Sequence, residues 1–273
     1  MKTVPSVSGT CGPGQVEFYK SGLLKSGNCP GRHVLRSGKR ELIIERGCYA
    51  EFDHHGKLEK ISTPINSREG PVRFFIGGRI IDVYGAEFAP DLSPISASLS
   101  APAKIMTRSG ELLFSAKPVT FHETGSVKSG IFPAGAPLPM KGGAVTPENE
   151  VDAEFRADGT LEKLFFPDTP MRRGGKIIRS MAGEKLICAY MVFDPLGWIS
   201  ETYLEYPAVF RAGALNLRIR GKVAFHPGEA LREGCLSGEE ILLVGGRRKR
   251  CSGMIELTKE GKVLRCETMR NVK

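Results

Sequence analysis

The chain has 273 residues, of which 41% are hydrophobic and 25% are charged, and it contains 33 glycines and 18 prolines. This composition is typical of a folded protein rich in turns and excludes a disordered chain. The formal net charge of +9 favours acidic partners, such as an acidic protein, an anionic lipid surface or another polyanion. The longest apolar runs, 187–193 and 241–244, have the length of strands, so the sequence predicts a chain that does not span a membrane.

The N-terminal residues and the cysteines limit the cellular compartments and the kinds of functional site that the sequence supports. The first ten residues contain no apolar stretch typical of a signal peptide, so we expect either a cytoplasmic protein or one whose leader has been removed. Seven cysteines without a CxxC pair give no support to a zinc ribbon or a thioredoxin-like site. The sequence predicts no cofactor and no metal site.

Phenylalanine recurs along the chain at intervals of roughly 34 residues. In most copies an apolar residue stands two positions before it, a glycine four positions after it and another apolar residue six positions after it. Residues two apart lie on one face of a strand, and an x-Gly pair between two strands predicts a tight turn, because glycine tolerates positive φ. Each copy therefore predicts a β-hairpin. The series comprises Phe18, Phe52, Phe88, Phe121, Phe155, Phe193 and Phe225, with Leu257 in the last place; Leu92 and Gly228 depart from the glycine position.

A second glycine flanked by apolar residues follows each phenylalanine by about 20 to 26 residues and indicates a second pair of short strands. We therefore predict an all-β protein of tandem repeats, each of about 34 residues, that form an open elongated β-meander or solenoid over residues 15–267. Residues 1–14 are expected to form an N-terminal extension and 268–273 a C-terminal tail. The alternative is a closed β-propeller, although seven full units and half of an eighth do not suit closure by strand exchange.

The pattern F-x-x-x-G-x-[LVI], with "YKSG" and "LKSG" in the first copy, resembles the hairpin core of bacterial tandem β-hairpin repeat proteins, including MORN-like variants. MORN repeats are shorter, and their glycine-rich second half is not matched. The resemblance implies a scaffold or membrane-surface role in a bacterial cell envelope. It carries over no catalytic residues.

The cysteines permit two crosslinks at the ends of the array. Cys11 with Cys29, and Cys251 with Cys266, stand on opposite strands of predicted hairpins, where a disulfide would limit fraying. Paired cysteines would place the protein in the periplasm or outside the cell, and unpaired ones in the cytoplasm. The alternative is that the cysteines are small buried thiols that fill the core.

The sequence predicts that the protein is not an enzyme. His122 and His226 follow a recurring phenylalanine and are expected to face solvent, while the "DHHG" of residues 53–56 is expected to be a turn. Nucleophile elbows, phosphate-binding loops and zinc-protease motifs are absent from the sequence.

Basic residues gather around the second glycine of the units. The equivalent turns of stacked repeats share one edge, so these cations are expected to form a basic edge that binds an anionic partner. The alternative is that they only keep sheet edges from pairing. The predicted binding residues are Arg36, Lys39, Arg40, Arg172, Arg173, Lys176, Arg247, Arg248, Lys249 and Arg250.

The leading hypothesis for function is thus a non-catalytic interaction scaffold. Two alternatives stay open: a hydrolase or carbohydrate-binding protein on a closed propeller, and a structural subunit that self-assembles through its sheet edges.

Overall fold

The structure is a computed structural model that describes residues 16–29, 31–37, 40–44, 47–63, 72–76, 79–141, 143–166, 177–179, 185–228 and 230–267. Within these ranges every regular element is a β-strand and no helix occurs, which confirms the all-β prediction. The predicted extension at 1–14 and the tail at 268–273 lie outside the described residues. The chain divides into two compact units, one of residues 1–107 and 111–130 and the other of residues 108–110 and 131–273.

Antiparallel hairpins of a first kind, here called primary hairpins, carry the recurring phenylalanines. The phenylalanine ends the first strand in seven of the eight hairpins, and Leu257 ends it in the last. Their strands are β1 (Glu17–Phe18) and β2 (Leu24–Asn28), β5 (Tyr49–Phe52) and β6 (Leu58–Ser62), β8 (Arg79–Phe88) and β9 (Pro94–Leu99), β12 (Pro118–Phe121) and β13 (Val127–Phe132), β16 (Val151–Phe155) and β17 (Leu161–Phe165), β19 (Lys185–Phe193) and β20 (Ile199–Ala212), β21 (Leu215–Phe225) and β22 (Leu231–Leu236), and β25 (Met254–Leu257) and β26 (Val263–Cys266).

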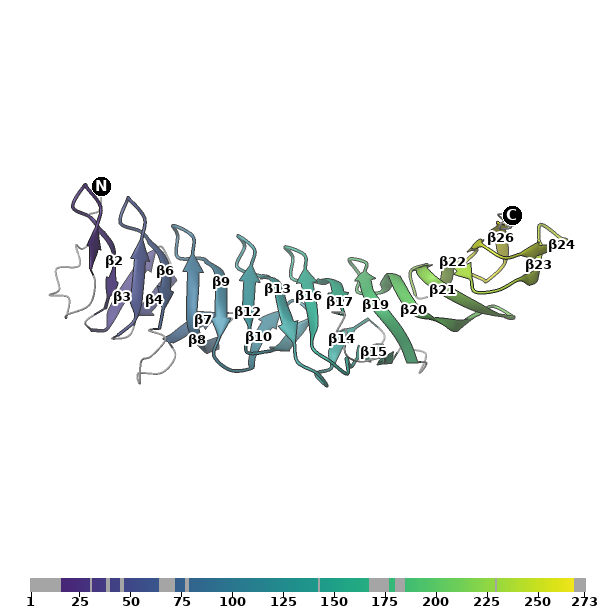
Figure 1. Ribbon diagram of the computed structural model, residues 1–273, viewed down its shortest axis with the longest axis horizontal. Helices are drawn as coiled ribbons and strands as arrows, with labels where there is room; N and C mark the ends of the chain where they lie inside the picture. Colours follow the sequence, from purple (N-terminus) through teal and green to yellow (C-terminus); the bar gives the residue numbers. More distant parts are fainter. Residues whose placement is uncertain are drawn as a thin grey trace, which may run out of the picture. The chain divides into compact units, whose positions relative to one another are not determined.

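Secondary hairpins lie between the primary ones along the chain, at the second glycine of the predicted units. Some are separate two-stranded sheets, and others extend a strand of a primary hairpin (Figure 1). Their strands are β3 (His33–Ser37) and β4 (Arg40–Ile44), β7 (Val72–Ile76) with β8, β10 (Ala103–Thr107) and β11 (Gly110–Phe114), β14 (Leu138–Met140) and β15 (Gly143–Val145), β18 (Ile177–Arg179) with β19, β20 with β21, and β23 (Glu240–Val244) and β24 (Arg247–Cys251).

The primary hairpins join edge to edge in sequence order. In the first unit the antiparallel order is β1-β2-β5-β6-β8-β9-β12-β13, and in the second it is β16-β17-β19-β20-β21-β22-β25-β26. Within each unit the eight strands of these primary hairpins pair one after another in one continuous antiparallel sheet. A propeller would divide its strands into separate four-stranded blades, so the alternative of a closed β-propeller is wrong.

The turns of the primary hairpins share one hydrogen-bond pattern. In the second hairpin the Asp53 N–H donates to the Lys57 carbonyl oxygen at 2.8 Å, and the Gly56 N–H donates to the Asp53 carbonyl oxygen at 2.9 Å. Gly56 has φ +78°, so the loop is a turn of three residues that ends in a left-handed glycine bulge. The predicted tight turn with a positive-φ glycine is therefore present, and its loop has three residues because the glycine forms a bulge. The same pair of bonds closes the turns that begin at Tyr19, Ala89, His122, Arg156, Asp194 and Thr258.

Leu92 takes the glycine position in the third primary hairpin. Its φ of +62° lies in the left-handed region, which costs a non-glycine residue roughly 1–2 kcal/mol. We expect Leu92→Gly to raise the free energy of unfolding of the first unit by up to about 1 kcal/mol, because the lost strain is partly offset by the entropy of the unfolded glycine. Urea unfolding of the two proteins measures the difference, and a lower midpoint for the variant would contradict it.

The two faces of the sheet differ in burial and charge, as one row of cross-strand neighbours shows. In the first unit the row runs through Ala50, Ile61 and Ala86, which are buried and pack on the inner face. One residue further along each strand, Glu51, Lys60 and Glu87 face each other on the outer face, where the Lys60 Nζ lies 3.9 Å from Glu87 Oε1. Cross-strand pairs of opposite charge stabilise such a face modestly.

Five of the seven recurring phenylalanines are buried on the inner face, Phe52 is half-buried, and Phe18 is exposed. Phe88, Phe121 and Phe225 are buried, and Leu257 is buried in the last position. Phe18 is 63% exposed although it holds the same place in its turn. The first hairpin thus shares the backbone geometry of the others, whereas its aromatic side chain lacks their cover.

Candidate functional site

In three primary hairpins the residue after the recurring phenylalanine connects to the next hairpin. The Tyr19 hydroxyl donates to the Phe52 carbonyl oxygen at 2.9 Å, and the Arg156 guanidinium donates to the carbonyl oxygens of Phe193 and Leu161. The His226 Nε2 lies 2.9 Å from the Leu257 carbonyl oxygen. The prediction that this position faces solvent is wrong for His226, since its ring satisfies a backbone acceptor in the next hairpin.

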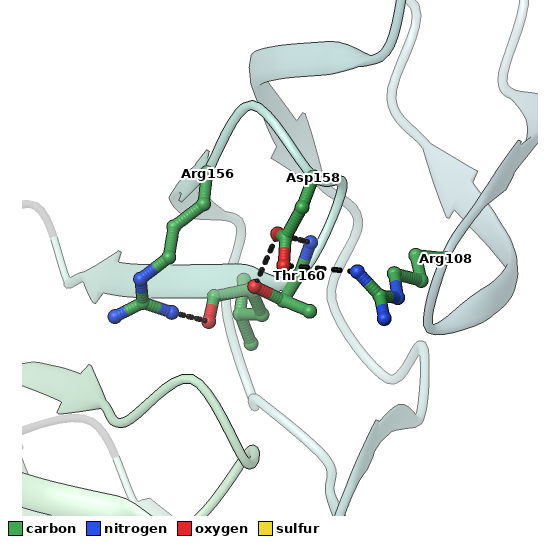
Figure 2. Close-up of polar contacts among 5 residues, drawn as sticks. Arg108, Arg156, Asp158 and Thr160 are labelled. Atoms are coloured by element: carbon green, nitrogen blue, oxygen red, sulfur yellow. Dashed lines mark hydrogen bonds and ion pairs between the residues drawn. The ribbon is translucent and has the colours of Figure 1, made fainter.

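An aspartate at this or a nearby turn position instead closes its own loop. Figure 2 shows the turn of the fifth primary hairpin, where Asp158 Oδ1 accepts from the Thr160 N–H at 2.9 Å and from the Thr160 hydroxyl at 2.7 Å. Its other oxygen forms an ion pair with the Arg108 guanidinium at 3.1 Å. The two Thr160 bonds and the Arg108 charge lower the pKa of Asp158. Asp53 caps the "DHHG" turn in the same way, with Oδ1 accepting from the His55 and Lys57 amides, so these residues form a turn as predicted.

Turns of the secondary hairpins lie against the glycines of primary turns in the second unit. A Cβ added at Gly159 would lie 3.2 Å from the Arg108 backbone nitrogen. The Lys141 N–H donates to the Gly197 carbonyl oxygen at 3.2 Å, and the Lys141 ammonium lies 5.6 Å from the Trp198 ring centroid. The closest approach is at Gly261, where a Cβ would lie 2.5 Å from the Gly213 nitrogen. These contacts fix the secondary hairpins to the sheet.

A shallow groove of about 220 Å³ lies between these turns of the second unit. Its volume is below the range of about 300–1,000 Å³ that holds most small-molecule ligands. The lining contains no histidine and no carboxylate, and Lys141 is the one ionisable side chain among its residues. The lining residues are Ser109, Lys141, Thr160, Leu161, Phe193, Pro195, Leu196 and Gly197.

A polar cluster occupies the outer face of the second unit. The Tyr190 hydroxyl donates to Glu201 Oε1 at 2.8 Å, and the Lys222 Nζ lies 2.8 Å from Glu201 Oε2. Burial and the bond to Glu201 raise the pKa of Tyr190 to about 12. Burial also opposes ionisation of Glu201, but the bonds from Lys222 and Tyr190 outweigh it, so the pKa of Glu201 is lowered. The raised pKa of Tyr190 and the lowered pKa of Glu201 keep the phenol protonated and the carboxylate ionised at neutral pH, which suits a structural cluster and not proton transfer.

The structure describes some of the predicted basic residues and not others. Lys39, Arg172, Arg173 and Lys176 lie outside the described residues, and of Arg40 only the backbone in β4 is described. Arg36 is exposed on β3. Arg247, Arg248, Lys249 and Arg250 are consecutive and exposed on β24 of the second unit.

The β23–β24 hairpin combines this basic strand with exposed aliphatic side chains. Ile241 is opposite Arg250, and Leu243 is opposite Arg248, so these four side chains share one face. Ile241 and Leu243 are 67% and 62% exposed, whereas Leu242 on the other face is buried. The Arg250 guanidinium forms an ion pair with Glu239 at 2.8 Å. Sequence reasoning found the cations but missed the aliphatic residues, although the alternation in "EILLV" places Ile241 and Leu243 on one face.

A disulfide ties the base of this hairpin to the main sheet. The structure joins Cys251, the last residue of β24, to Cys266 in β26, with 5.8 Å between the Cα atoms. Cys11 lies outside the described residues, so the predicted partner of Cys29 is not described. Cys188 is buried, and burial raises the pKa of its thiol to about 11, which makes it a poor nucleophile.

Removing this disulfide is expected to destabilise the second unit. A crosslink that closes a loop of 15 residues restricts the unfolded chain by about 3 kcal/mol. We expect the double variant Cys251→Ser/Cys266→Ser to lose about that much free energy of unfolding, and a reductant to lower the unfolding midpoint of the native protein only. Equal midpoints with and without reductant in the native protein would contradict the prediction.

Across the part of the chain that the structure describes, no group of three or more histidine, cysteine or acidic side chains is arranged to hold a metal ion. In that same part no helix has the length and apolarity needed to cross a membrane.

No protein-family model matches the chain, and no curated protein matches it. Among solved structures, the chain is similar to a chain of the Tc holotoxin pore of Photorhabdus luminescens, at 10% identity and a TM-score of 0.18. The match covers 90% of this chain and 15% of that one. A similarity of this size carries no argument about fold or function.

Proposed function

We propose that the protein is a non-catalytic interaction scaffold that binds an anionic partner through the β23–β24 hairpin. The observation that carries the proposal is the run of four exposed cations on one short strand, Arg247 to Arg250. Among the described residues only Arg250 of these four has a carboxylate at ion-pair distance. Three uncompensated cations within about 10 Å lie inside one to two Debye lengths at physiological salt, so their fields add.

The sheet serves as the support in this proposal. Primary hairpins that share one turn geometry fit an array of equivalent units of about 34 residues, each of which covers the apolar face of its neighbour. Such an array presents secondary hairpins from a rigid base. The Cys251–Cys266 disulfide favours a protein that matures in an oxidising compartment, as in a bacterial envelope or outside the cell.

The function is tested with polyphosphate as a simple polyanion. We expect the variant Arg247→Gln/Arg248→Gln/Lys249→Gln/Arg250→Gln to bind polyphosphate at least about tenfold more weakly at low salt and to show a smaller slope of log affinity against log salt, since fewer counterions are released. The matched control Arg218→Gln/Arg220→Gln/Arg232→Gln/Lys259→Gln removes four exposed cations elsewhere in the second unit. Equal losses in both variants would show that only net charge matters and would contradict the proposal.

A further inference from the structure

The exposed face of the β23–β24 hairpin carries two kinds of side chain in a fixed arrangement. Ile241 and Leu243 lie two residues apart on β23, which places their side chains about 7 Å apart at the same height above the hairpin. Arg250 and Arg248 stand directly opposite them on β24. The face therefore has an aliphatic half and a cationic half side by side.

Packing on the other face of this hairpin keeps the aliphatic and cationic side chains exposed. Leu242 and Val244 are buried beneath it, and Cys251 is bonded to Cys266 at its base. Glu240 is exposed but alternates onto the other face, while Glu239, just before β23, forms the 2.8 Å ion pair with Arg250. Among the described residues, Arg248 is therefore the cation of this face without a carboxylate at ion-pair distance, and Arg250 exchanges an exposed ion pair when it binds another anion. The hairpin cannot rotate to hide Ile241 and Leu243 without exposing Leu242 and Val244.

We infer that the anionic partner of this hairpin is a lipid bilayer surface, into which Ile241 and Leu243 insert while Arg248 and Arg250 bind lipid phosphates. The inference rests on the proposed function, because it names the class of the anionic partner. An acidic protein would need an apolar pocket shaped for two aliphatic side chains beside its carboxylates. A bilayer interface supplies phosphate groups and acyl chains next to one another with no matching shape. Arginine suits this position, since its aliphatic stem lies along the acyl boundary while the guanidinium stays at the phosphates.

The test compares vesicles of phosphatidylcholine alone with vesicles that also contain phosphatidylserine, in a flotation assay. We expect the protein to bind only the second kind. Ile241→Ser/Leu243→Ser should weaken this binding at least about tenfold, because two aliphatic side chains no longer insert into the bilayer. It should leave polyphosphate binding unchanged. Arg248→Gln/Arg250→Gln should weaken binding to both ligands.

The control variant Ile80→Ser/Met106→Ser removes two exposed aliphatic side chains from secondary hairpins of the first unit and should bind vesicles normally. Binding of Ile241→Ser/Leu243→Ser to the anionic vesicles at native strength would overturn the inference. So would a native protein that binds polyphosphate, or the acidic polypeptide polyglutamate, but not the vesicles. Loss of the proposed function itself would appear separately, as a failure of the native protein to bind polyphosphate through Arg247 to Arg250.

Discussion

Replacing Gly261 with alanine is expected to lower the free energy of unfolding of the second unit by about 2–5 kcal/mol. Gly261 has φ +81°, which costs an alanine roughly 1–2 kcal/mol. The new Cβ would also lie 2.5 Å from the Gly213 nitrogen and 2.7 Å from the Ala212 carbonyl oxygen. Both are backbone atoms, which cannot turn aside as a flexible side chain can, and overpacking of this kind typically costs a further 1–3 kcal/mol or so.

Gly197 provides the matched control within the same unit. It holds the same turn position with φ +85°, and a Cβ there would meet the Lys141 Cβ at an ordinary 3.6 Å. Gly197→Ala should therefore cost only the backbone strain, about 1–2 kcal/mol. Chemical denaturation of both variants measures the difference. Equal losses would show that the turn of β20 and β21 does not press on Gly261.

Truncating Phe121 is expected to cost the first unit about 3–5 kcal/mol, while truncating Phe18 should cost less than about 1 kcal/mol. The two residues hold the same place in their turns, but Phe121 is 6% exposed and Phe18 is 63% exposed. The cost follows the apolar area that each ring buries, so it differs although the local backbone is the same.

Denaturant unfolding of Phe121→Ala and Phe18→Ala measures the two losses in one unit. A large loss for Phe18→Ala would mean that its ring is covered in solution. A small loss for Phe121→Ala would mean that the recurring phenylalanines are not core residues.

The hairpins were predictable from the sequence because their signals are local. Apolar residues two apart, such as Ala50 and Phe52, specify a strand face, and Gly56 four residues after Phe52 specifies a left-handed turn. The chain therefore reads correctly as strand, turn and strand at each primary hairpin.

Contacts between hairpins were not predictable, because they join residues more than 30 positions apart. The sequence predicted that His226 faces solvent. The 2.9 Å distance from its Nε2 to the Leu257 carbonyl oxygen shows that the side chain connects two hairpins. The approach of Gly213 to Gly261 likewise depends on how the long hairpin of β20 and β21 folds over the sheet. The exposure of Phe18 is a third case, since a turn motif does not reveal whether a neighbour covers it.

The candidate site was predicted in part. The cations of β24 were visible as a run of like charge, but the register that sets Ile241 opposite Arg250 required the structure. A one-residue slip of β23 would have placed Leu242 on the exposed face instead.

Amide hydrogen exchange, followed residue by residue with and without anionic vesicles, tests the central claim most directly. The account predicts added protection concentrated in the β23–β24 hairpin, residues 240–251, with the primary hairpins unchanged. Protection spread over the first unit, or none in residues 240–251 while the protein is bound, would contradict it.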